Sequence, residues 1–153
     1  MMPTTGQLVL YMDVDGVLFQ MQAMGRSPNL RPGVSDFLNW CDQRFACRWL
    51  TSWNEKDIQQ LCHLIYAPCG ARWPWVPWNA CKSDSICFND DLLWLDDAPT
   101  DQDYENFQMF RRTGRLQEIL TVDPRSVGAL IGVRRTLADF LAVYAKQEGR
   151  HAA

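Results

Sequence analysis

Residues 7 to 19, QLVLYMDVDGVLF, join a short apolar run to two carboxylates and a glycine. The run from 7 to 12 is β-prone, as expected of a parallel strand that is buried on both faces. Asp13 and Asp15 would point to opposite faces of the sheet if the strand continued through them. We therefore expect the strand to end at Asp13, and Gly16 to let the backbone turn so that both acids reach one site.

The composition indicates one globular domain. The chain has 153 residues, 47% of them hydrophobic and 22% charged, which fits one full core and argues against a second domain. We assign the domain to residues 1–148 and expect a frayed tail at 149–153.

The net charge of −3 argues against a strongly electrostatic nucleic-acid binder. No apolar run approaches the roughly 20 residues that span a bilayer, so we expect a soluble, cytoplasmic protein without a membrane partner. Nothing in the sequence indicates an oligomeric state.

Strand and helix patterns alternate along the rest of the chain. The later strands are predicted at 46–51, 92–96 and 117–122, and the helices at 32–45, 54–65, 100–112 and 133–147. Such alternation implies an α/β fold with a Rossmann-like parallel sheet between helices on both faces, in three layers.

Two stretches are predicted as loops. Residues 19–31 are polar and contain glycine and proline. Residues 67–81 carry three prolines and three tryptophans, which exclude a regular helix but allow a short strand near 75–78. The tryptophans of this second loop either stack nucleobases at the rim of a site or pack beneath a loop that proline makes rigid. Lys82 follows and opens a short helical segment.

Polar side chains follow three of the predicted strands. They are Asp13 and Asp15, then Thr51 and Ser52, then Asp96 and Asp97. The carboxyl ends of parallel strands meet at one edge of a sheet, where ligands bind. Crowded carboxylates repel one another unless a cation neutralises them, and oxygen ligands with open positions suit Mg²⁺ bound together with a phosphate. The sequence therefore predicts a magnesium site at this edge.

These residue types also suit phosphoryl transfer. One carboxylate can attack phosphorus as a nucleophile, and a second acid can protonate the leaving oxygen and later activate water. Thr51 would donate a hydrogen bond to a phosphoryl oxygen. Lys82, one of only three lysines in the chain, would neutralise charge on the nucleophile and the phosphate.

Four segments carry a family resemblance. DVDGV at 13–17, LTSW at 50–53, Lys82 and WLDD at 94–97 resemble, in order and in context, the four motifs of the haloacid dehalogenase superfamily. The resemblance implies a hydrolase acting through an aspartyl-phosphate intermediate.

The resemblance also implies roles for single residues. Asp13 would be the nucleophile and Asp15 the general acid and base. Asp13, the Val14 carbonyl and Asp96 would hold the metal, with Asp97 beside them and helping to orient Lys82. The backbone of Gly16 and the Thr51 or Ser52 hydroxyl would contact the phosphate together with Lys82, and we favour Thr51 because it ends its strand.

In detail the chain is most similar to the phosphatase-like domain of bacterial RNA-repair proteins, which share the DVDGV start, a tryptophan after the threonine and a WxDD motif.

The segments from Asp15 to Thr51 and from Thr51 to Lys82 are too short for the cap domain of larger members of the superfamily. An open site suits bulky phosphorylated partners such as nucleic-acid ends. Two alternatives are a non-catalytic phosphate- or nucleic-acid-binding module, and a small-nucleotide phosphatase whose site a partner or the Trp/Pro loop would close.

The six cysteines have no CxxC spacing and most are expected to be buried thiols. An alternative is a zinc site built from Cys62, His63, Cys69 and Cys81. A nucleophile pair of Cys62 and His63 is disfavoured, because neighbours on a helix point about 100° apart.

Overall fold

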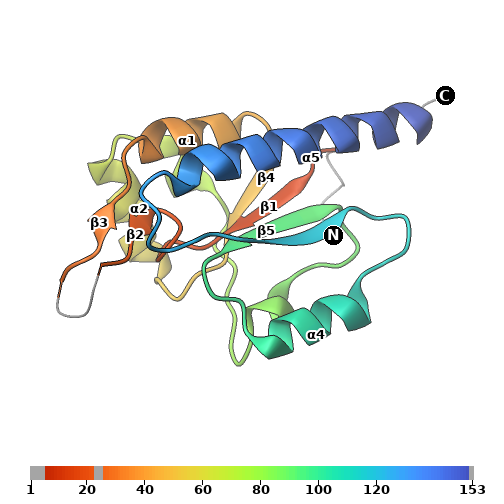
Figure 1. The fold of residues 1–153 in the computed structure, drawn as a ribbon, viewed down its shortest axis with the longest axis horizontal. Helices are drawn as coiled ribbons and strands as arrows, with labels where there is room; N and C mark the ends of the chain where they lie inside the picture. Colours follow the sequence, from red (N-terminus) through yellow and green to blue (C-terminus); the bar gives the residue numbers. More distant parts are fainter. Residues whose placement is uncertain (1–5, 23–25, 152–153) are drawn as a thin grey trace.

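The computed structural model describes residues 6–22 and 26–151 and has the α/β fold that the sequence predicts (Figure 1). Four parallel strands form the central sheet in the order β4, β1, β5, β6. Their bounds are Val9–Met12 for β1, Ala46–Trp49 for β4, Leu92–Asp96 for β5 and Gln117–Thr121 for β6.

Helices cover both faces of this sheet, which gives three layers (Figure 1). Helices α1 and α5 lie over one face and α4 over the other. The helices are α1 (Val34–Asp42), α2 (Glu55–Leu64), α3 (Pro68–Arg72), α4 (Asp101–Phe110) and α5 (Ala129–His151), with a 3-10 turn, η1, at Lys82–Ser85. No helix in the described ranges is long and apolar enough to cross a membrane.

The central strand is buried on both faces, as its composition predicts. Leu10 and Met12 belong to the larger core cluster, which α1, α2 and α5 complete. Val9 and Tyr11 belong to the smaller cluster, together with Phe107 of α4. Alternate side chains of β1 therefore anchor the two helical layers to one strand.

The strand order places a switch point beside β1. The chain leaves β1 through α1 to reach β4 on one side, and later returns to β5 on the other side. In the register, Met12 lies opposite both Trp49 and Leu95. Asp13 therefore lies between the residues that follow those two partners, at the edge where open α/β sheets bind ligands.

Two of the predicted loops contain regular structure. In the stretch 19–31, β2 (Phe19–Gln20) pairs antiparallel with β3 (Asn29–Leu30). The prediction of a plain loop is wrong here because two-residue strands are too short to show alternation.

The Trp/Pro stretch, 67–81, also differs from its prediction. It contains α3, which begins at Pro68, a position where proline suits a first helical turn. Instead of a strand at 75–78, one isolated bridge joins Trp75 to Trp49.

The last helix is longer than predicted. It begins at Ala129 and continues through Gly149 to His151, beyond the expected start of a tail. Between Asp15 and Thr51 the described residues form only the β2–β3 pair, α1 and β4, so no large cap domain is inserted there.

Candidate active site

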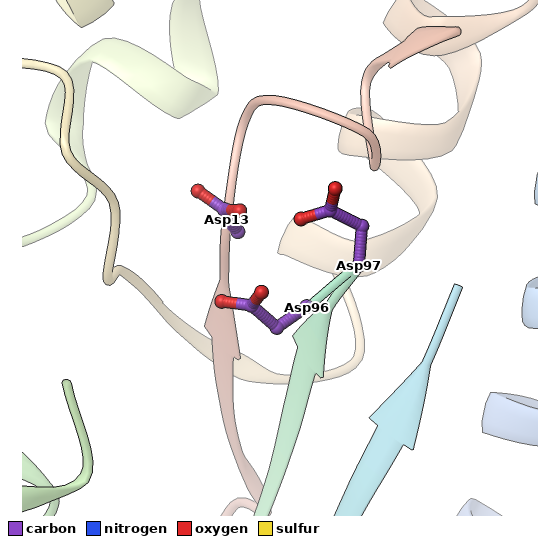
Figure 2. A group of neighbouring side chains, drawn as sticks. All are labelled: Asp13, Asp96 and Asp97. Carbon is purple, nitrogen blue, oxygen red and sulfur yellow. The ribbon is translucent and has the colours of Figure 1, made fainter. Parts of the chain in front are cut away.

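Three carboxylates converge at the ends of β1 and β5 (Figure 2). Asp13 follows the last residue of β1, Asp96 ends β5 and Asp97 comes next. One oxygen of each lies within 4.8 Å of the others. The backbone amide of Asp13 donates to the Leu95 carbonyl at 3.0 Å, which fixes Asp13 beside Asp96. Asp13 and Asp96 are buried and Asp97 is half-buried.

Lys82 provides a positive charge in this cluster. Its Nζ lies 2.7 Å from Asp96 Oδ2 and 3.3 Å from Asp13 Oδ2. The prediction that Asp97 orients Lys82 is therefore corrected, because the lysine pairs with Asp13 and Asp96. Burial acts to lower the pKa of Lys82, but the charges of Asp13 and Asp96 outweigh burial and raise this pKa above its ordinary value.

The carboxylates carry more charge than Lys82 balances. Burial, followed by repulsion from Asp96, raises the pKa of Asp13 to about 7, although Lys82 and the Val14 amide oppose this rise. Burial and repulsion from Asp96 also raise the pKa of Asp97. A buried acid with a raised pKa indicates an environment short of positive charge.

These residues fit a hard divalent cation. Carboxylate oxygens are the ligands that Mg²⁺ prefers, and Asp13, Asp96 and Asp97 supply three within one small space. The Val14 carbonyl does not fit the role that the sequence suggested. Its oxygen accepts the amides of Leu18 at 2.9 Å and Val17 at 3.3 Å, so it points into the turn after β1.

The two candidate hydroxyls differ in burial. β4 ends at Trp49, two residues before Thr51, rather than at Thr51 as predicted. Thr51 is buried, and a hydrogen bond from its side chain helps to lower the pKa of Asp13. Its Oγ1 also accepts the Trp53 amide at 3.2 Å. Ser52 is exposed. The structure therefore favours Thr51 as the hydroxyl beside the nucleophile.

Gly16 allows the acidic loop to approach the end of β5. Its φ of +75° lies in the left-handed region, which residues with a Cβ rarely adopt. A Cβ at this position would overlap the side chain of Asp97. The glycine therefore makes the turn and leaves room for a carboxylate of the cluster.

Asp15 lies in the turn that leaves β1 and is half-buried. Its Oδ1 accepts a hydrogen bond from the Trp53 indole at 3.1 Å. The ring of Trp53 stacks on Phe19, with centroids 5.7 Å apart. Trp53 is visible in the sequence, but its hydrogen bond to Asp15 depends on how the chain turns after Thr51.

The tryptophans of the Trp/Pro loop direct their indole N–H groups at protein acceptors. Trp78 donates to the Thr51 carbonyl at 2.8 Å and Trp75 to the Trp53 carbonyl at 3.0 Å. Trp73 is buried and donates to Asp42 at 2.8 Å. These bonds support the packing interpretation of this loop.

Arg31 is a site neighbour that the sequence does not reveal. It is buried, and it donates through Nε to the Val17 carbonyl and through Nη2 to the Gly16 carbonyl, each at 2.9 Å. Nη2 also donates to the Asp123 carbonyl at 3.0 Å, and Nη1 to that of Ser126. Burial lowers the pKa of Arg31. Backbone carbonyls leave no sequence pattern, so nothing in the sequence marks this residue.

A buried polar network supports the turn that carries Lys82. Asp103 of α4 accepts the amide and the hydroxyl of Ser83, at 3.1 and 2.6 Å, on one oxygen. Its other oxygen accepts the amide and hydroxyl of Thr100, both at 2.9 Å. Asn106 donates to the Ser83 hydroxyl at 2.8 Å. The network fixes η1 against the start of α4.

The alternative cysteine sites are not formed. Among the described residues, the only group of three or more potential metal ligands is the aspartate cluster. Cys62 is buried and His63 is exposed, as the helix geometry predicts. Four cysteines are buried, as expected: Cys41, Cys47, Cys62 and Cys69.

Comparisons with known proteins extend these observations. No protein-family model matches the sequence, and no curated protein matches it. Among solved structures, the chain is similar to a hydrolase of the haloacid dehalogenase-like family from Streptococcus pneumoniae. The TM-score is 0.52 and the identity 12%, over 90% of this chain and 100% of that chain. The chain therefore has the fold of a haloacid dehalogenase-like hydrolase.

Proposed function

We propose that this protein is a Mg²⁺-dependent phosphomonoester hydrolase that acts through an aspartyl-phosphate intermediate. The observation that carries the proposal is the buried Asp13, paired with Lys82 at 3.3 Å and surrounded by two further carboxylates at the strand ends. The similarity in fold to a haloacid dehalogenase-like hydrolase supports the same reaction class.

In the first half-reaction, a carboxylate oxygen of Asp13 attacks phosphorus and the bond from phosphorus to the leaving oxygen breaks. Asp15 gives its proton to that oxygen, so the alcohol leaves neutral. Lys82 and the Thr51 hydroxyl stabilise the charge that develops on the phosphoryl oxygens.

In the second half-reaction, water attacks phosphorus while Asp15 takes up a proton from it. The bond to Asp13 breaks, which releases phosphate and restores the enzyme. Asp13, Asp96 and Asp97 would hold Mg²⁺, which neutralises their charge and polarises phosphoryl oxygens when bound.

The lack of an inserted domain beside the strand ends, among the residues that the structure describes, is what supports large substrates. The segments that flank the strand ends are the short β2–β3 pair and the Trp/Pro loop, and neither forms a domain that encloses a ligand. We therefore propose phosphorylated macromolecular ends, including those of nucleic acids, as the substrate class. The narrower likeness to RNA-repair proteins stays a prediction from the sequence motifs.

The test is a panel of nucleotides, phosphopeptides and oligonucleotides with 5′- or 3′-phosphates, assayed with Mg²⁺ and with a chelator. We expect phosphate release that needs Mg²⁺ and that falls by on the order of 10³-fold or more in Asp13→Asn. Asp101→Asn, at an exposed site, is the charge-matched control. Unchanged turnover in Asp13→Asn would refute the mechanism. Binding of phosphorylated ligands without turnover of any of them would instead indicate a non-catalytic module.

A further inference from the structure

We propose that Trp53 is the positioning residue for Asp15, and that it makes Oδ2 of Asp15 the atom that transfers the proton. This inference rests on the proposed hydrolase function. It adds a residue outside the charged cluster and assigns separate tasks to the two oxygens of one carboxylate.

The first observation is the bond from Trp53 Nε1 to Asp15 Oδ1, at 3.1 Å. An indole N–H can only donate, so Oδ1 acts as an acceptor whether Asp15 is protonated or ionised. In a protonated carboxyl group the carbonyl oxygen is a better acceptor than the hydroxyl oxygen, so the indole bond favours Oδ1 as the carbonyl oxygen. The proton that Asp15 carries in the first half-reaction therefore lies on Oδ2.

The second observation is that the indole is itself held in place. Its ring stacks on Phe19 with an interplanar angle of 24°, and Phe19 forms a backbone bridge with Asp15. Asp15, Trp53 and Phe19 thus form one contact group. Rotation of the indole would break both the stack and the hydrogen bond.

The third observation connects Trp53 to the hydroxyl beside the nucleophile. The Trp53 amide donates to Thr51 Oγ1 at 3.2 Å, and the Trp53 carbonyl accepts the Trp75 indole at 3.0 Å. One residue therefore contacts both the proposed proton donor and the proposed phosphate-binding hydroxyl. This arrangement sets the direction of proton transfer relative to the bound phosphoryl group.

The chemical consequence concerns the leaving oxygen. As the bond from phosphorus to that oxygen breaks, the oxygen takes the Oδ2 proton and Asp15 is left as a carboxylate. An alkoxide leaving group needs this proton, whereas 4-nitrophenolate is stable without it. A defect in the placement of Oδ2 should therefore slow alkyl phosphates much more than 4-nitrophenyl phosphate.

The experiment compares Trp53→Phe with the unchanged protein, in Mg²⁺, on alkyl phosphates and on 4-nitrophenyl phosphate. Rates of the first turnover are measured by rapid mixing, because the second half-reaction also uses Asp15. We expect alkyl phosphates to slow by about 10-fold or more, the loss of one hydrogen bond to a charged group. We expect 4-nitrophenyl phosphate to change by less than about 3-fold, with KM little altered for either substrate.

The matched control is Trp73→Phe, which removes an indole bond to Asp42, 2.8 Å long, that reaches neither Asp15 nor Trp53. It should change both substrate classes by the same factor. Phe19→Leu is a second variant, which keeps the Trp53 N–H but removes the stacked ring, and it should show the same leaving-group dependence as Trp53→Phe. In an Asp15→Asn background, Trp53→Phe should have no further dependence on the leaving group.

Two results would overturn the proposal: an equal loss with both substrate classes in Trp53→Phe, or a leaving-group dependence that persists in the Asp15→Asn background. Neither result bears on the nucleophile. Failure of the proposed function shows separately, as turnover that Asp13→Asn leaves unchanged.

Discussion

Gly16 meets two structural requirements at a single residue. Its positive φ alone would cost a side chain about 1–2 kcal/mol. A Cβ added at this position would also overlap the Asp97 side chain, which adds a steric cost that depends on how far that carboxylate can move. Because Asp97 belongs to the proposed metal cluster, this steric overlap would disturb the cluster as well as the fold.

We predict that Gly16→Ala lowers the free energy of unfolding by about 2–4 kcal/mol and strongly reduces turnover, because Asp97 is displaced. Gly33→Ala is the matched control, since Gly33 has a φ of +77° and its added Cβ would meet nothing within 4 Å. It should cost only about 1–2 kcal/mol and keep turnover. Urea unfolding and the phosphatase assay measure the two effects, and equal results for both variants would contradict the steric argument.

The turn that carries Lys82 and the helix α4 form one unit through Asp103. Asp103 lies in the first turn of α4, where an acid interacts favourably with the helix dipole. In the structure it is buried and also accepts bonds from the preceding turn. Burial acts to raise its pKa, but the bonds from Ser83 and Thr100 outweigh burial and lower this pKa below 3.8.

A lowered folded-state pKa means that Asp103 contributes stability above pH 3.8, and that this contribution is lost as the pH falls through the folded-state pKa. We predict that Asp103→Asn lowers the free energy of unfolding by about 1–3 kcal/mol at pH 7. The difference from the unchanged protein should shrink as the pH falls below 3.8. Urea unfolding between pH 3 and pH 7 measures it, with the exposed Asp101→Asn as control. A difference that stays constant with pH would show that the carboxylate charge is not responsible.

Across the whole molecule, the charge at the strand ends opposes folding in the absence of a cation. An acid with a raised folded-state pKa destabilises the fold at pH values above its ordinary pKa, here 3.8, and both Asp13 and Asp97 are raised. A cation that binds only the folded state would remove this cost and add its binding free energy.

We predict that Mg²⁺ at 100 times its Kd stabilises the protein by about 2.7 kcal/mol and raises Tm by about 5–10 °C. Asp97→Asn should leave Tm unchanged or higher without metal, because it removes a disfavoured charge, and should reduce the rise with Mg²⁺. Thermal melts with and without Mg²⁺ measure both effects, with the exposed Asp36→Asn as control. A lower metal-free Tm together with a full Mg²⁺ response would show that Asp97 serves the fold alone.

The sequence by itself determined the features that depend on a few neighbouring residues. The apolar runs before Asp13 and Asp96 predict β1 and β5. The helix predicted from residue 54 is α2, and Asn54 caps it by accepting the Asp57 amide at 2.8 Å. Strand alternation and helix caps involve residues fewer than about five positions apart, so the pattern is visible in the chain. The alternation of elements then implied a parallel sheet and a common edge for the acids.

Only the tertiary structure decided which of these residues meet. Lys82 pairs with Asp96 and Asp13, although the motif alone suggested a role for Asp97 in orienting it. Arg31 reaches the acidic loop from a segment that the sequence does not connect to it. Trp53 belongs to a motif that the sequence shows, but its bond to Asp15 appears only in the structure. Such contacts depend on strand register and on loop paths that bring distant residues within about 3 Å of each other. A shift of one residue along a strand moves an atom by about 3.3 Å, which is enough to break such a contact. The sequence therefore determined which groups lie at the strand ends, and the packing of the whole chain decided which atoms face one another.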